Sequence, residues 1–209
     1  MAFFFNGSSS YIETTSTPIT GAPFTMACWF KPNLQSQSAS LIHMGLSSGS
    51  ARFQMRTDAN SLIFQTGGGG ATTSASTPIA TWNNPTWFHA TAVAFSPISR
   101  FIYFNGGGKV QNTTSRTPAG INNTTIGAQI VGGTRDNFFN GDIAEPAIWN
   151  TTLTDDEILS LSKGFAPSLV RPTNLKFYNR CIRTPQDLYG GLNFTSVNLT
   201  ITDHPRIYG

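Results

Sequence analysis

Short apolar segments alternate with clusters of Gly, Pro, Asn and Ser along most of this 209-residue chain. Residues 24–31 show the pattern most clearly, because Phe24, Met26, Cys28 and Phe30 occupy every second position. A period of two places these side chains on one face of a strand. Many short strands separated by turn residues predict an all-β fold. The predicted strands are 3–5, 11–14, 24–31, 41–46, 51–56, 61–66, 87–95, 100–105, 124–128 and 137–149.

Turn signals join several of these strands. Residues 57–60 predict a hairpin between two strands, and Asn105-Gly106 predicts another that leads into Lys109-Val110. The glycine tract at residues 67–70 is interpreted as a flexible connection that continues into a polar Thr/Ser stretch. It is not a phosphate loop, because neither a Lys-Ser/Thr pair nor a helix follows it.

One short helix is expected after residue 153. Thr154 and Glu157 have the spacing of a capping box, in which each side chain bonds to the backbone of the other. Leu153 and Ile158 fit the hydrophobic staple that flanks such a box. Gly164 is a natural end for the helix.

The character of the sequence changes at Gly164, because Pro residues interrupt the remaining segment at several positions. Only two weak strands are predicted there, at residues 175–178 and 196–201. The segment is too small for a substantial core of its own. We therefore expect a sandwich over residues 1–163 and an irregular extension over 164–209. The extension either packs along the sandwich or reaches a neighbouring molecule.

Charged residues make up only 11% of the chain, well below the roughly 25% typical of soluble proteins. The surface must therefore be formed largely by Ser, Thr, Asn and Gly. The net charge of +3 comes from Lys and Arg residues that are scattered singly, which argues against nucleic acid as a partner. The first residues resemble neither a signal peptide nor a membrane span, so we expect synthesis in a cytoplasm and no membrane partner.

Cys28 and Cys181 lie far apart in the sequence. Cys28 is in an apolar run, where a free cysteine usually behaves as a small core residue. The low number of cysteines favours free thiols. A disulfide stays open as an alternative, because sequence separation says nothing about distance in space.

The order and spacing of several motifs resemble the laminin-G-like branch of the concanavalin A-like jelly-roll superfamily, in the form common in bacterial and phage proteins. The resemblance covers roughly residues 1–163 and implies a two-sheet antiparallel jelly-roll sandwich. The family often has Asp-Gly before its hairpin strand, where this chain has Ser99-Arg100. The motifs are residues 2–13, 24–32, Trp87-Phe88-His89, 101–106, Ile126-Gly127, 139–150 and 153–158.

The extension adds a second, narrower resemblance. Residues 164–168 and 202–206 are similar to the ends of laminin-G-like proteins of phages. This implies a setting on a virion surface.

Catalysis is not expected, and no catalytic residue is assigned. Glycosidases of related fold use two carboxylates across a cleft. The chain has three glutamates, Glu13, Glu145 and Glu157, and the helix cap occupies the last. Asp142 is three residues before Glu145, a spacing that points to opposite faces of an extended strand. The histidines lack metal-ligand spacing, and His89 is interpreted as a packed structural residue.

Calcium is the one cofactor that the sequence suggests. Asp136, Asn140 and Asp142 cluster beside Gly132-Gly133 with Asn137, and a hard cation takes six to eight oxygen ligands from loops of this kind. Asp58 with Asn60 offers a second set. Ordinary polar turns are the alternative interpretation of both groups.

A carbohydrate site is predicted in the loop that contains Trp82, Asn83 and Asn84. A Trp beside Asn and Pro is hard to place in a core strand, and an exposed aromatic ring can stack on a sugar. The same Trp could instead anchor the loop or a protein interface.

These observations support three hypotheses. The first is a non-enzymatic virion-surface protein, such as a capsid decoration or a fibre- or tail-associated module. Its partners would be other virion proteins, further copies of itself in a homo-oligomer, and cell-surface glycans. The second is a calcium-dependent carbohydrate-binding lectin, and the third is a glycoside hydrolase.

Overall fold

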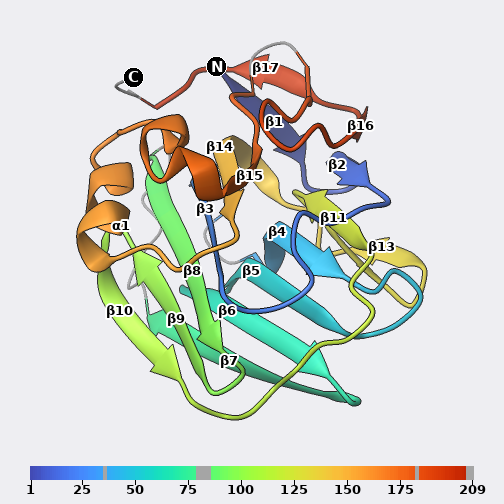
Figure 1. Ribbon diagram of the computed structural model, residues 1–209. Coiled ribbons are helices and arrows are strands. Elements are labelled where there is room, and N and C mark those ends of the chain that lie inside the picture. The colour runs from blue at the N-terminus through green and yellow to red at the C-terminus, as the bar shows by residue number, and fades with distance from the viewer. Residues whose placement is uncertain (35–36, 79–85, 182–183, 206–209) are drawn as a thin grey trace.

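The computed structural model describes residues 1–34, 37–78, 86–181 and 184–205. They form two antiparallel β-sheets packed face to face, with one α-helix on the outside (Figure 1). The predicted all-β jelly-roll sandwich is therefore confirmed. The first sheet has eight strands, in the order β10-β9-β8-β3-β14-β1-β17, and β15 also pairs with β14. Their bounds are Gly107–Asn112 (β10), Ser99–Phe104 (β9), Phe88–Ser96 (β8), Phe24–Pro32 (β3), Asn140–Trp149 (β14), Ala2–Asn6 (β1), Thr200–Thr202 (β17) and Leu175–Tyr178 (β15).

The second sheet has seven strands, in the order β16-β2-β11-β4-β5-β6-β7. A separate two-stranded hairpin of β12 and β13 follows β11 in the chain. The bounds are Thr195–Val197 (β16), Tyr11–Thr14 (β2), Asn123–Ile126 (β11), Ala39–Gly45 (β4), Arg52–Asp58 (β5), Ser61–Gly68 (β6), Ala71–Pro78 (β7), Gln129–Val131 (β12) and Thr134–Asp136 (β13).

The main core lies between the two sheets and is rich in phenylalanine. Phe24 of β3 packs edge-on against Phe53 and Phe64 of the opposite sheet, with ring centres 4.8 and 6.1 Å apart. Edge-to-face pairs of this kind add specific geometry to the burial of apolar area. Cys28 and Cys181 are buried in the same core as free thiols.

A second, smaller core covers the outer side of the eight-stranded sheet. The helix α1 (Asp155–Ser162) and the 3-10 turns Pro167–Leu169 and Pro172–Asn174 lie over this face (Figure 1). Trp149 is fully buried beneath them, and its indole Nε1 donates to the carbonyl of Val170 at 2.7 Å. Within the described residues, no helix is long and apolar enough to cross a membrane.

The helix begins as predicted. Thr154 is the N-cap, and its hydroxyl oxygen accepts from the Glu157 amide at 3.3 Å. The Glu157 carboxylate accepts from the Thr154 amide at 2.8 Å, which completes the capping box. Leu153 and Ile158, the predicted staple, are both buried in the second core.

Three strands were not predicted, and each lacks an apolar alternation. β7 is built from Ala, Thr and Ser, so its inward side chains include Ala75 but no large apolar residue. It replaces the polar connection expected after the glycine tract, because Gly67 and Gly68 belong to β6 and only Gly69 and Gly70 form the turn. β12 and β13 have three residues each.

The C-terminal extension adds strands to both sheets. Residues 175–178 form β15, as predicted. The prediction of a single strand over residues 196–201 is wrong, because Asn198 adopts a left-handed conformation and turns the chain. β16 then joins β2 at the edge of the seven-stranded sheet, and β17 joins β1 at the edge of the other. The described part of the extension thus packs along the sandwich.

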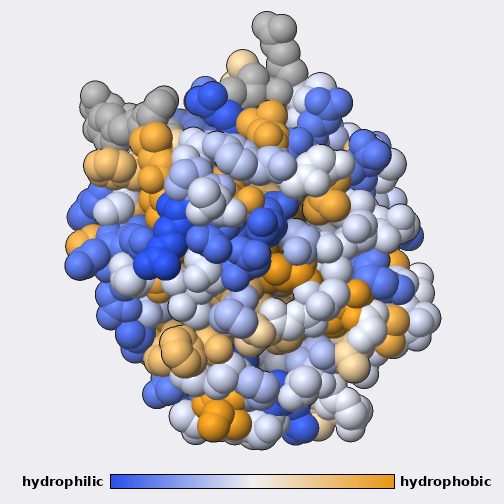
Figure 2. Space-filling model, in the orientation of Figure 1, coloured by the Kyte–Doolittle hydropathy of each residue, from blue (hydrophilic) through white to orange (hydrophobic). Residues whose placement is uncertain are grey.

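Little of the described surface is strongly apolar. Figure 2 shows one face of the molecule, where weakly polar residues predominate and hydrophobic ones lie in separate patches. The exposed large hydrophobic side chains are spread over several elements, among them Phe95, Ile98, Leu159 and Phe165. This surface agrees with the low charge content of the sequence.

We expect the extension to contribute to global stability. Phe177→Ala should lower the free energy of unfolding by about 3–5 kcal/mol, because Phe177 is only 1% exposed in the main core. Phe165→Ala is the matched control in the same extension. Phe165 is 48% exposed, so its replacement should change stability by less than about 0.5 kcal/mol. Urea unfolding at neutral pH measures both, and equal effects would contradict the prediction.

Candidate functional site

A continuous row of polar side chains crosses the outer face of the seven-stranded sheet. Phe53 and Met55 of β5, and Leu62 and Phe64 of β6, point into the core, so the residues between them face outward. The strand register aligns such outward residues across all seven strands. The row consists of Thr195, Glu13, Thr125, His43, Gln54, Gln65 and Ser74.

The β12–β13 hairpin packs against one half of this face. Arg135 donates through Nε and Nη2 to the Glu13 carboxylate at 2.6 and 2.8 Å, and its guanidinium lies 5.0 Å from the centre of the Tyr11 ring. Gln129 Oε1 accepts from Gln54 Nε2 at 2.8 Å. Glu13 and Gln54 are consequently buried, and this half of the row is closed to a large ligand.

His43 lies in the middle of the closed half. It is fully buried, and neither ring nitrogen has a hydrogen-bond partner among the described residues. Burial, together with the nearby charge of Arg52, lowers the pKa of His43 to about 3. His43 is therefore neutral at physiological pH and serves as a packing residue.

His89 behaves similarly on the outer face of the other sheet. Its ring packs edge-on against Trp29, with centres 5.1 Å apart, and burial lowers its pKa to about 3. The prediction that His89 is a packed structural histidine is confirmed.

The other half of the face is open, and we call it the β5–β7 platform. Its outward side chains alternate with the inward apolar ones on three adjacent strands. Two guanidinium groups, one carboxamide, three hydroxyls and one aliphatic side chain form it. The platform consists of Arg52, Arg56, Ile63, Gln65, Thr72, Ser74 and Ser76.

Arg52 is held flat against the platform. Its Nε and Nη2 both donate to Gln65 Oε1, at 3.1 and 2.8 Å, and Nη1 donates to the Ser50 carbonyl at 3.1 Å. Gly67 lies opposite Arg52 in the register, and a Cβ there would come within 2.7 Å of the Ser50 carbonyl oxygen. The glycine therefore leaves the space that Arg52 occupies. Burial, and then the charge of Arg56, lower the pKa of Arg52.

The platform has the chemistry of a surface that binds neutral polar molecules. Among the described residues, no hydrogen bond engages the side-chain amide nitrogen of Gln65 or the hydroxyls of Ser74 and Ser76. Planar amide and guanidinium groups on rigid strands can meet pairs of hydroxyls with defined geometry. Sequence reasoning missed these residues, although the alternation of polar and apolar side chains in β5 would have identified Arg52 and Arg56 as outward-facing.

The predicted carbohydrate residues Trp82, Asn83 and Asn84 lie outside the described residues. Their loop leads from β7, at the edge of the platform, to β8 in the other sheet. Their role stays a prediction.

The predicted calcium residues lie on two elements. Asp136 is exposed at the end of β13, whereas Asn140 and Asp142 lie on β14. The Asp142 carboxylate pairs with Lys31 Nζ at 2.7 Å and accepts from the Thr202 hydroxyl at 2.8 Å. These contacts already neutralise the most buried of the three ligands, and calcium binding stays a prediction.

The carboxylate of the second suggested set of calcium ligands, Asp58, also has protein partners. Asp58 accepts from the Ser38 hydroxyl and lies 3.6 Å from Arg56 Nη2. Across the part of the chain that the structure describes, no cluster of three or more His, Cys, Asp or Glu side chains could hold a metal ion.

Glu145 forms a buried cluster that the sequence did not reveal. A bulge in β14 places Glu145 at φ +53, and its carboxylate accepts from the Tyr178 hydroxyl and contacts His204 Nε2 at 2.7 Å. Burial, reinforced by the charge of Glu145, raises the pKa of Tyr178. The cluster joins β14 to two parts of the extension, which makes it a structural clasp.

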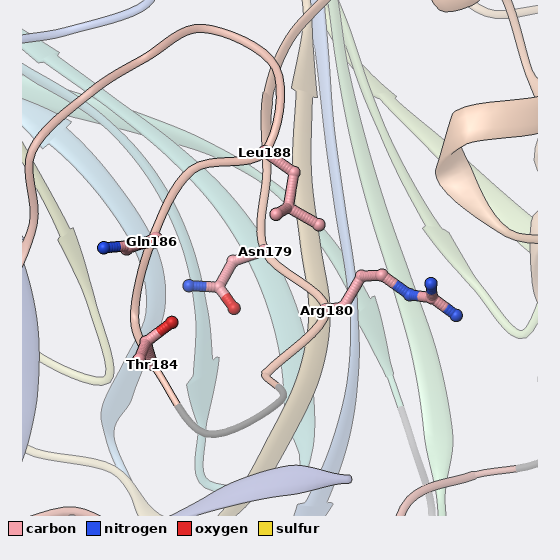
Figure 3. A pocket seen from close by; sticks show the side chains of 5 residues that line it. All are labelled: Asn179, Arg180, Thr184, Gln186 and Leu188. Atoms are coloured by element: carbon pink, nitrogen blue, oxygen red, sulfur yellow. The ribbon is translucent and has the colours of Figure 1, made fainter.

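A cavity of about 290 Å³ lies in the extension itself, lined by Asn179, Arg180, Thr184, Gln186 and Leu188 (Figure 3). Thr184 and Gln186 lie on the same side of Asn179, and Arg180 extends away in the opposite direction. Asn179 is buried, and its Oδ1 accepts from the Cys181 amide at 2.6 Å. That bond supports the chain conformation here, so we assign no ligand to the cavity.

A family model described as the concanavalin A-like lectin/glucanases superfamily matches residues 6–159. No curated protein matches the chain in sequence.

Solved structures with the same fold share little sequence with this chain. A putative carbohydrate-binding protein from Bacteroides ovatus has a TM-score of 0.67 at 18% identity, over 98% of this chain and 60% of its own. The CBM40 of the Ruminococcus gnavus IT-sialidase, bound to α2,6 sialyllactose, has a TM-score of 0.62 at 16% identity, over 77% of this chain and 96% of its own. Domain 4 of AbnA, an extracellular arabinanase from Geobacillus stearothermophilus, in complex with arabinotriose, has a TM-score of 0.63 at 20% identity, over 77% of this chain and 76% of its own. At these identities the similarity shows the fold alone.

Burial of neutral histidines makes stability depend on pH. The pKa of His43 and of His89 is about 3 in the folded protein, against about 6.5 in an unfolded chain. The unfolded chain binds more protons between these values, so stability falls as the pH drops through that window. His43→Leu should reduce the slope of unfolding free energy against pH, between pH 7 and 5, by up to about 1.4 kcal/mol per pH unit.

Urea unfolding at pH 7, 6 and 5 measures this slope. Met44→Leu, a non-titratable change at the next residue of β4, should leave it unchanged. At pH 7 we expect His43→Leu to be at least as stable as the wild type, because two buried polar atoms without partners are removed. A slope equal to that of the wild type would contradict the role given to His43.

Proposed function

Because this chain belongs to the concanavalin A-like lectin/glucanases superfamily, we propose that it is a glycan-binding protein without catalytic activity, with its sugar site on the β5–β7 platform. The observation that carries the proposal is the register of β5, β6 and β7. It places Gln65 directly opposite Ser74 on the outer face of the sheet, with Arg52 diagonal to Gln65 on β5. The other face of these strands packs into the core.

Sugars fit this arrangement chemically. A pyranose ring presents hydroxyl groups along its edge and apolar C–H groups on its faces. Gln65, Ser74 and Ser76 offer donors and acceptors to the edge, whereas Ile63 between them is only 9% exposed and contributes little contact area. Binding sites generally combine apolar contact with a few fixed polar groups.

The carboxylates support a role without catalysis. Most glycoside hydrolases use a pair of Asp or Glu carboxyl groups that flank the scissile bond. Glu13 is paired with Arg135, Glu145 is buried with Tyr178 and His204, and Glu157 caps α1. Each of the three glutamates is thus held in a structural contact.

The similar structures give further support. Their names describe a carbohydrate-binding protein, a CBM40 bound to sialyllactose and an arabinanase domain in complex with arabinotriose. We extend this property to the present chain, and we include the loop of Trp82, Asn83 and Asn84 because it follows β7 directly.

The setting that we propose is the surface of a virion. There the protein would act as a capsid decoration or as a fibre- or tail-associated module, in contact with other virion proteins and with further copies of itself. The resemblance of the tail to phage proteins supports this setting. Mass spectrometry of purified particles tests it, and a protein that stays in the soluble lysate while particles form without it would contradict it.

A glycan array tests the proposed site. We expect the double variant Arg52→Ala, Gln65→Ala to reduce apparent affinity by tenfold or more, because it removes hydrogen bonds worth about 1–3 kcal/mol in total. Arg180→Ala, a change of the same kind in the extension, should leave binding intact. Trp82→Ala should also weaken binding if the loop stacks on the sugar.

Two further conditions separate the alternatives. Binding that is lost in a chelator and restored by calcium would support the calcium-dependent lectin, with Asp136, Asn140 and Asp142 as ligands. Full binding by the platform double variant would refute the platform as the site. Release of shorter sugars from a bound glycan would refute the absence of catalysis.

A further inference from the structure

A second cavity, of about 170 Å³, lies at one end of the sandwich. Residues 113–122, which we call the strap, cross this end from β10 to β11, along the lower side of Figure 1. The cavity lies between the strap, the β2–β3 loop and the β8–β9 turn. Its lining includes Gly21, Phe53, Ser96, Arg100, Arg116 and Thr117.

Arg100 is a buried residue in the lining of this cavity. Only 1% of Arg100 is exposed, and its guanidinium donates to Asn112 Oδ1 at 2.6 Å and to the carbonyls of Pro97, Thr114 and Arg116. All of these acceptors are neutral. The full positive charge of Arg100 therefore stays at this end of the molecule, and burial, followed by the charge of Arg116, lowers its pKa.

Arg116 adds a second positive charge with spare hydrogen-bonding capacity. Its Nε is buried and has no hydrogen-bond partner among the described residues. All ten Asp and Glu residues of the chain are described, and none of them pairs with Arg100 or Arg116. A buried donor without a partner, beside two guanidinium groups that no carboxylate contacts, favours the approach of an anion.

We propose that this cavity binds the carboxylate of an acidic sugar, with Arg116 as the contact residue and Arg100 as the buried charge behind it. The guanidinium fork matches a carboxylate in geometry as well as in charge. Ser96 and Thr117 add hydroxyls, and Phe53 adds an apolar wall for the sugar ring. The volume suits one charged group and part of one ring, not a whole oligosaccharide.

The cavity and the platform share one end of the seven-stranded sheet. Phe53 follows Arg52 directly in β5, and because the two side chains face opposite sides of the sheet, a ligand that reaches both bends around this end of the strands. Gly68, at the end of β6, packs so closely on the strap that a Cβ there would lie 3.2 Å from the Thr117 carbonyl oxygen. This inference rests on the proposed function, because it makes the cavity the subsite for the acidic residue of a glycan whose neutral part lies on the platform.

The test compares sugars that differ only in charge. The probes are the methyl glycosides of glucuronic acid and of N-acetylneuraminic acid, each paired with its neutral methyl ester, and titration calorimetry gives the Kd. We expect at least one acid to bind about tenfold or more tightly than its ester, as a charge-assisted hydrogen bond provides. The preference should shrink at high salt.

Arg116→Gln should abolish the preference for the acid while neutral glycans still bind. Arg180→Gln, which removes an exposed arginine of the extension, should retain the preference. If Arg116→Gln does not fold, Arg116→Lys replaces it. That variant keeps the charge but loses the fork, so a reduced preference is expected and an unchanged one would count against the inference.

The outcomes separate this inference from the proposed function. Equal binding of acid and ester in both pairs, with neutral glycans still bound, overturns the acidic subsite and leaves the glycan-binding proposal standing. No binding of any sugar overturns both. Inorganic phosphate that binds as tightly as the acids, and is equally sensitive to Arg116→Gln, would show an anion site that does not recognise sugars.

Discussion

The packing of phenylalanines between the two sheets is the constraint on which the other features depend. Once Phe24 fits between Phe53 and Phe64 across the sandwich, the register of β5 and β6 is set. Because strand side chains alternate with a period of two, the same packing fixes which residues face outward. A slip of one residue would bury Arg52 and expose Phe53. The platform is therefore a direct consequence of the core, and its geometry is as rigid as the core is.

The extension shows how a segment without its own core can become ordered. An antiparallel sheet that ends in an open edge exposes unpaired backbone groups. β16 and β17 supply the missing partners at β2 and β1, one in each sheet. The Thr202 hydroxyl donates to Asp142, and the Ser10 hydroxyl donates to the Asn198 carbonyl between the two strands. The strand preference of the local sequence is weak here, but the edges of the sandwich provide partners for pairing. The clasp of Tyr178, Glu145 and His204 adds a buried attachment.

Sequence reasoning succeeded where the signal is local and failed where it depends on pairing. The capping box at Thr154 involves residues only three apart, so it could be predicted in full. Long strands with alternating apolar residues were also predictable. β7 was not, because Ala, Thr and Ser acquire their role only by pairing with β6 along its whole length. The polar row could not be predicted for the same reason. Glu13, His43 and Gln54 lie in one row only because of the strand register, which cannot be derived from the sequence. The bulge at Glu145 likewise depends on the pairing of β14 with β3.

The distribution of charge links the platform to the cavity beneath the strap. The chain has thirteen Lys and Arg residues and ten Asp and Glu residues, a small excess that would mean little if it were spread evenly. Lys31, Arg56, Lys109, Arg135 and Arg171 are paired with carboxylates, whereas Arg52, Arg100, Arg116, Lys163, Lys176 and Arg180 form no ion pair among the described residues. Three of these six, Arg52, Arg100 and Arg116, lie toward one end of the seven-stranded sheet. On a surface with so few charges, an uncompensated group of this kind dominates the local field and biases which ligands approach. The neutral polar groups of the platform can contact a sugar, and the positive end favours one orientation of a ligand that carries a negative charge.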